Sequence, residues 1–176
     1  MNTVDLIHYS LGFSFELLEG LVTDLTPEQA DWQPPGDALP ISALYWHIVH
    51  YVDKLVHDWG MGQQPPLAQT AGWGEKVLLA SPAVDPDDPM GDLRAVNQGL
   101  RVDLQILHHY ARATAETILN WVASLTPEDL ERTLPTPIGD LNLGQILQAF
   151  IVLHINNHIG EISVLRGCQG LKGYPW

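Results

Sequence analysis

The chain has 176 residues and a formal net charge of −13, from 21 Asp and Glu against 8 Lys and Arg. It is long enough to bury a core as one domain over residues 1–176, and its 45% of hydrophobic residues is typical of a soluble globular protein. With so few cations there is no basic patch to follow a phosphate backbone, which excludes nucleic acid as a partner. An anionic membrane surface would repel the chain as well.

The single cysteine, Cys168, excludes an internal disulfide framework and fits a reducing cytosol. Residues 1–5 lack the positive charge of a secretory signal, and no run of about 18 apolar residues could span a membrane. By elimination we expect a cytoplasmic protein. No histidine or carboxylate lies close to Cys168 in sequence, so we interpret it as an inert residue at a helix end.

Helical periodicity recurs in four long segments. Apolar residues at steps of three or four predict helices over residues 3–21, 40–58, 100–125 and 142–166. Gly167 follows the last of these as a candidate C′ glycine. No segment shows the alternation that is typical of a strand.

The tetrapeptide Leu-Thr-Pro-Glu occurs twice, at residues 25–28 and 125–128, each time after a long helix. In both copies the threonine can cap a short helical turn that begins with proline. The chain is therefore interpreted as two successive helical hairpins, which pack naturally as a bundle. We predict an all-α fold, a four-helix bundle.

The second and third helices are joined by residues 58–99, a connection of roughly 40 residues that is long for a bundle. It is rich in proline, glycine and acidic residues, and residues 75–79 have helical character. It either crosses one end of the bundle and roofs a pocket, or it is a surface connection without a special role.

Two histidines, His154 and His158, lie four residues apart in an apolar run. Positions i and i+4 share one helix face, about 6 Å apart along the axis, so both imidazoles can bind one metal ion. They belong to a seam that is expected to face the core: Leu143, Leu147, Phe150, His154, His158, Glu161 and Leu165. Buried polar groups need partners, and a metal ion would supply one. The alternative is a histidine pair that is merely hydrogen-bonded at a half-exposed position.

The second helical segment offers three histidines as a further ligand. His50 lies nearly opposite its apolar arc, with Lys54 and His57 near it, so we interpret His50 as solvated. His47 lies between the edge of the arc and the polar face, so helical periodicity favours His47 as the further metal ligand. The other three are scattered: His8, and the adjacent pair His108 and His109, which we interpret as mostly exposed.

Two segments resemble the DinB/YfiT-like superfamily. Residues 42–49, Ser-Ala-Leu-Tyr-Trp-His-Ile-Val, are similar to its first metal-histidine segment. Residues 154–162, His-Ile-Asn-Asn-His-Ile-Gly-Glu-Ile, are similar to its second, H-x-x-x-H-x-G-E. The Leu-Thr-Pro-Glu turn ahead of the second helix and the tail at residues 165–173 also match. The resemblance covers nearly the whole chain and is weakest in the middle.

The resemblance implies a DinB/YfiT-like four-helix bundle that binds one divalent metal ion through His47, His154 and His158, and that forms a homodimer. Some members of the family are metal-dependent transferases or isomerases that use a low-molecular-weight thiol such as bacillithiol or mycothiol. Many members have no assigned activity. Zinc and nickel are the first candidates for the ion, and imidazole also suits iron and copper.

Glu161 lies one turn beyond His158. It either orients a histidine or assists proton transfer, or it pairs with an arginine across the bundle. Three tryptophans either line a pocket or belong to the core: Trp46, Trp73 and Trp176.

Three functions are compatible with these features. The first is metal-dependent transfer of a low-molecular-weight thiol to a small electrophilic substrate, an S-transferase reaction of the detoxification type. The second is a non-catalytic bundle stabilised by metal. The third is a stress-related interaction protein, which no sequence motif supports. We favour the first, because three imidazoles leave a coordination position open, as catalytic metal sites do.

Overall fold

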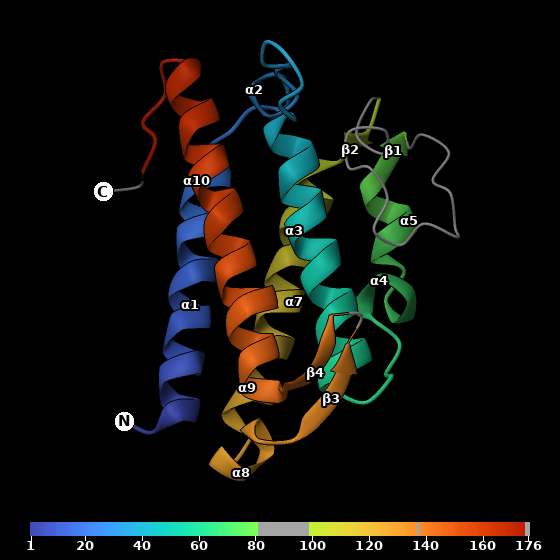
Figure 1. Ribbon diagram of the computed structural model, residues 1–176. Helices are drawn as coiled ribbons and strands as arrows, with labels where there is room; N and C mark the ends of the chain where they lie inside the picture. The colour runs from blue at the N-terminus through green and yellow to red at the C-terminus, as the bar shows by residue number, and fades with distance from the viewer. Residues whose placement is uncertain (81–98, 137, 175–176) are drawn as a thin grey trace.

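The computed structural model describes residues 1–80, 99–136 and 138–174. Four long helices form a bundle: α1 (Thr3–Val22), α3 (Ile41–Leu55), α7 (Leu104–Ala123) and α10 (Leu153–Cys168). Each packs on two neighbours, in the order α1, α7, α3, α10 around the ring (Figure 1). The prediction of an all-α four-helix bundle is confirmed. No helix in the described residues is long and apolar enough to cross a membrane.

Short helical elements complete the fold: α2 (Pro27–Ala30), α4 (Leu67–Thr70), α5 (Trp73–Val77), α8 (Pro127–Leu130) and α9 (Leu143–Ile146). Two π-helical segments continue the long helices, η1 (Val56–Gly60) after α3 and η2 (Leu147–Val152) before α10. Two antiparallel pairs of strands are also present, β1 (Leu78–Ala80) with β2 (Arg101–Val102) and β3 (Thr133–Thr136) with β4 (Gly139–Asn142). The prediction that the chain contains no strand was therefore wrong. Segments of two to four residues are too short to show the period of two by which a strand is recognised in a sequence.

The two Leu-Thr-Pro-Glu turns have the same structure. The side chain of Thr26 accepts a hydrogen bond from the Gln29 amide at 3.3 Å, and Thr126 accepts one from Asp129 at 3.2 Å. In each turn the threonine amide in return donates a hydrogen bond to the side chain of Gln29 or Asp129, which completes a capping box. The predicted repeat of the capping turn is confirmed, but the interpretation as two packed hairpins is wrong. Helices α1 and α3 run antiparallel, as do α7 and α10, but neither pair is adjacent in the ring (Figure 1).

The order of the helices explains the long connection. Helices α3 and α7 run in the same direction, so the chain must return along the bundle between them (Figure 1). The described part of this return, with α4 and α5, packs beside α3 and α7 and does not cross an end of the bundle as one prediction had it. The predicted acidic and proline-rich stretch at 85–89 and Trp176 lie outside the described residues.

The seam predicted over residues 143–165 is buried only in part. Leu143, Leu147 and Leu165 lie in the core as predicted, whereas His154 and His158 are half-buried and Glu161 is exposed. The core positions of α10 beside the two histidines are Ile155, Ile159 and Ile162. The isoleucines gain more from burial than imidazoles would, so the histidines lie at the edge of the core. The predicted end at Gly167 was also wrong: α10 continues to Cys168, and Gly170 is the glycine in the left-handed region, with φ +73°.

Arg166 joins the end of α10 to the end of α1. Its side chain is 4% exposed, and its guanidinium donates to the carbonyl of Leu21 at 2.6 Å and to that of Lys172 at 2.7 Å. It also forms two hydrogen bonds to the Asp24 carboxylate, at 2.7 and 3.0 Å. These bonds lower the pKa of Asp24, although partial burial acts in the opposite direction. The ion pair therefore stabilises the folded state only while Asp24 is ionised.

We expect Asp24→Asn to lower the free energy of unfolding by about 0.5–1 kcal/mol at pH 7, a small effect because the carboxylate is 66% exposed. Because the folded pKa lies below the unfolded value, the contribution is complete above about pH 4 and disappears as the pH falls through the folded pKa. Urea unfolding of both proteins from pH 7 to pH 3 measures the difference. A difference that stays constant over this range would contradict the assignment.

Candidate metal centre

Three imidazoles converge where α3 meets α10. His47 comes from α3, and His154 and His158 lie one turn apart on α10. The ring centroid of His47 is 5.0 Å from that of each of the other two, which are 4.6 Å from one another. One nitrogen from each ring lies within 4.8 Å of the others. Ligand nitrogens of one tetrahedral zinc ion are about 3.3 Å apart, so small side-chain rotations would let all three bind one ion.

The order of the helices around the ring explains why these two meet. Helices α3 and α10 are neighbours in the ring, where they lie side by side and antiparallel (Figure 1). Residues more than 100 positions apart in the chain thereby reach one site.

The chemistry of the three rings fits a cation. Burial, then the neighbouring His158 and His50, lower the pKa of His47 to about 4. Burial, then His158 and His47, lower the pKa of His154 to about 3. Both rings are therefore neutral near pH 7 and have an unprotonated nitrogen to offer. The Nε2 atom of His154 is buried and has no hydrogen-bond partner in the described part of the chain, a deficit that a metal ion would remove.

Glu161 lies beside the site on α10. Its Oε2 is 2.8 Å from Nδ1 of His158, and its side chain is 56% exposed. Of the alternatives that the sequence left open, the contact with a histidine is present, and Glu161 pairs with no arginine among the described residues. A carboxylate on Nδ1 leaves Nε2 of His158 free to bind an ion.

Tyr51 was not identified as a site residue from sequence. Its ring stacks on that of His154, with centroids 4.2 Å apart and an angle of 27° between the planes, and it lies 5.7 Å from the ring of His47. Its position four residues after His47 is the signal that could have found it. The stacked Tyr51 ring restricts the rotation of the His154 ring.

His50 and His108, which we interpreted as solvated or mostly exposed, are covered by other parts of the chain, and so is His57, which the sequence placed near His50. The ring of His50 is half-buried and stacks on Trp46 with centroids 4.8 Å apart. His57 is 5% exposed, with Nδ1 2.8 Å from the carbonyl oxygen of Asp53. His108 is half-buried and hydrogen-bonds the Tyr45 hydroxyl at 3.1 Å. Packing from other elements covers them, which the periodicity of one helix does not reveal.

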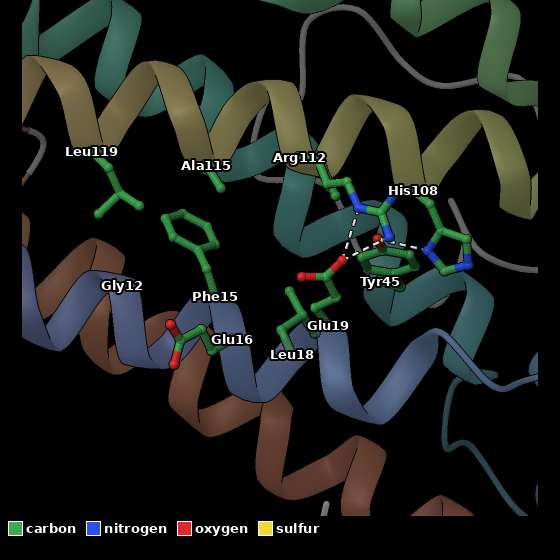
Figure 2. A pocket seen from close by; sticks show the side chains of 11 residues that line it. Gly12, Phe15, Glu16, Leu18, Glu19, Tyr45, His108, Arg112, Ala115 and Leu119 are labelled. Carbon is green, nitrogen blue, oxygen red and sulfur yellow. Dashed lines mark hydrogen bonds and ion pairs between the residues drawn. The ribbon is translucent and has the colours of Figure 1, made fainter.

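A cavity of about 200 Å³ opens between α1 and α7 (Figure 2). Phe15, Ala115 and Leu119 form its apolar part, and the ion pair of Glu19 and Arg112, 2.8 Å apart, lies toward its other end. In the ring of helices this contact is opposite the one between α3 and α10. The cavity is therefore separate from the three imidazoles.

Comparisons with known proteins agree with the fold. Residues 11–162 match the family model of the DinB superfamily. A solved structure, described as the crystal structure of the conserved protein of locus from Enterococcus faecalis, superposes with a TM-score of 0.77 at 17% sequence identity. The match covers 94% of this chain and 96% of that one. At this identity the likeness shows the fold alone. No curated protein matches the chain.

We expect His47→Ala, His154→Ala and His158→Ala each to lose stoichiometric metal, because two remaining imidazoles do not hold a divalent ion firmly. Elemental analysis after dialysis against metal-free buffer measures the content. His50→Ala is the matched control on the same helix and keeps its metal. Full retention in all three ligand variants would exclude this site.

We expect Glu161→Gln to weaken metal affinity by about 10- to 100-fold, because His158 loses the charged partner that orients its ring. Competition with a chromophoric chelator measures the affinity. Glu116→Gln, at an exposed position on α7, is the control. Equal affinities for the two variants would remove Glu161 from the site.

Proposed function

The chain belongs to the DinB superfamily, and we propose that it is a divalent-metal enzyme that transfers a low-molecular-weight thiol to a small electrophilic substrate. In this proposal His47, His154 and His158 hold the ion, with zinc or nickel as the first candidates. The convergence of three imidazoles from two helices, with His47 and His154 kept neutral by burial, is the observation that carries the proposal. A homodimer, as the family resemblance implies, is part of the same proposal.

The composition of the site favours catalysis over a purely structural role. Structural zinc sites are closed by four protein ligands, whereas catalytic sites have three and leave one position for water or substrate. Within the described residues the cluster contains three histidines and no fourth histidine, cysteine or carboxylate that could bind the same ion. A bound divalent ion would favour the thiolate form of a thiol substrate, which is the nucleophilic form.

The protein residues have separate tasks in this mechanism. Burial keeps His47 and His154 neutral near pH 7, so binding an ion displaces no proton from these two rings. Glu161 holds the ring of His158 through Nδ1 at 2.8 Å. Tyr51 packs on His154 and limits access of water from that side. The carboxylate of Glu161 is exposed enough to exchange a proton with solvent, so it is also the nearest candidate to accept a proton from an entering thiol.

We expect the metal-loaded protein to conjugate a small thiol to a halogenated or epoxide electrophile. Activity should fall to the background rate after chelation, and adding back one equivalent of metal should restore it. Screening glutathione, bacillithiol and mycothiol and following product by mass spectrometry tests this. His154→Ala is the inactive control. If no thiol reacts, and metal removal only lowers Tm, the metal-stabilised non-catalytic bundle is the correct alternative.

A further inference from the structure

We propose that a polar cavity beside the metal centre is a subsite for a zwitterionic head group, carrying an ammonium and a carboxylate, on the substrate. The proposal rests on the proposed function and extends it. The cavity measures about 520 Å³ and lies between α3, η1 and the chain around α4. Its lining is His50, Lys54, Asp58, Gln63, Gln64, Pro65, Pro66, Ala68 and Gln69.

The cavity begins one helical turn from His47 along α3, because His50 lines it while none of the three metal-centre histidines does. His47, His50 and Lys54 follow one another at steps of three and four residues, so they share one face of the helix. His50 is close enough to His47 to influence its pKa. Seven residues of helix separate His47 from Lys54, which corresponds to about 10 Å. A ligand that reaches from the ion to Lys54 is therefore larger than a single cysteine.

Within the described residues, the polar side chains that line the cavity form no ion pair or side-chain hydrogen bond. Neither Lys54 nor Asp58 forms an ion pair in the described part of the chain, although they are four residues apart. The side-chain amides of three glutamines likewise form no hydrogen bond within the described residues: Gln63, Gln64 and Gln69. A buried nitrogen, Nδ1 of His50, also has no partner among the described residues. Apart from His50 these side chains are exposed, so water solvates them in the free protein, and a polar ligand in the cavity would take the place of that water.

The wall of the cavity is held in place by Asp53, whose side chain is 0% exposed. Its carboxylate accepts hydrogen bonds from the backbone amides of Leu67 at 3.0 Å and Ala68 at 2.8 Å, and from the Tyr110 hydroxyl at 2.6 Å. These bonds fix the start of α4 against α3 and α7. Gln63 has φ +61°, a left-handed conformation that costs a non-glycine residue about 1 kcal/mol. A rigid and locally strained wall is typical of a binding site.

The charges decide the class of ligand. Burial lowers the pKa of His50, so its ring is neutral near pH 7. The cavity then carries one cation, Lys54, and one anion, Asp58. A carboxylate on the ligand would pair with Lys54 and an ammonium with Asp58, while the glutamine amides accept and donate hydrogen bonds. A peptide-sized thiol with a free amino-acid end has both charges and the required length.

The test measures binding by the zinc-loaded full chain with isothermal titration calorimetry. Reduced glutathione is the probe with a remote amino-acid end, and N-acetyl-L-cysteine is the short thiol without one. We expect Lys54→Met and Asp58→Asn each to weaken glutathione binding by about 10-fold, the worth of one charge-assisted hydrogen bond, and to leave N-acetyl-L-cysteine unchanged. Comparing each variant with the wild type cancels the intrinsic thiol pKa of each probe.

The exposed Asp37→Asn serves as the control and binds both thiols as the wild type does. Thermal melts check that the variants fold, which is expected because Lys54 and Asp58 are exposed. If both thiols bind the wild type and neither variant changes the glutathione affinity, the subsite is wrong and the proposed function stands. If neither thiol binds the wild-type metal-loaded protein, thiol transfer itself is wrong, and the subsite falls with it.

Discussion

The contact between α3 and α10 is the constraint on which this structure depends. The two helices bring one imidazole of α3 and two from the first turns of α10 together, with one nitrogen of each ring within 4.8 Å of the others. Burial keeps two of these rings neutral, and neutral rings can approach closely without the repulsion that imidazolium ions would suffer. The site therefore exists because the helices exclude water there, and the isoleucine face of α10 is what holds them together.

The topology creates the surroundings of the site. Since α3 and α7 are parallel, the chain between them must return along the bundle, and its described part packs against the outside of α3 (Figure 1). This return covers His50 and His57 and leaves a polar cavity next to the imidazoles. The chain between α3 and α7 thus buries side chains that an isolated helix would expose. It also forms one wall of the cavity where we propose that a charged head group binds.

The buried polar groups separate into two kinds. Asp53 and Arg166 are almost completely enclosed and make several hydrogen bonds each, which is the arrangement that makes a buried charge tolerable. They connect α4 and α7 to α3, and α10 to α1. In contrast, three buried side-chain atoms in the described residues have no partner, and two of them are Nε2 of His154 and Nδ1 of His50. Two of the three atoms without a partner thus lie at the places where we propose that ligands bind, and the third, Oγ1 of Thr114, lies in the core on α7.

The sequence alone determined the helical segments, the repeated capping turns and the pair His154 and His158, because these features depend on periodicity and on contacts within three or four residues. The identity of His47 as the third member rested on a slight difference in helix phase and on the family resemblance. Only the tertiary structure decided that His50 and His57 are covered and that Glu161 contacts His158. It alone also decided that Tyr51 stacks on His154 and that Asp53 accepts hydrogen bonds from the start of α4. Each of these depends on packing between segments far apart in the chain, and the period of a single helix carries no information about what packs against it.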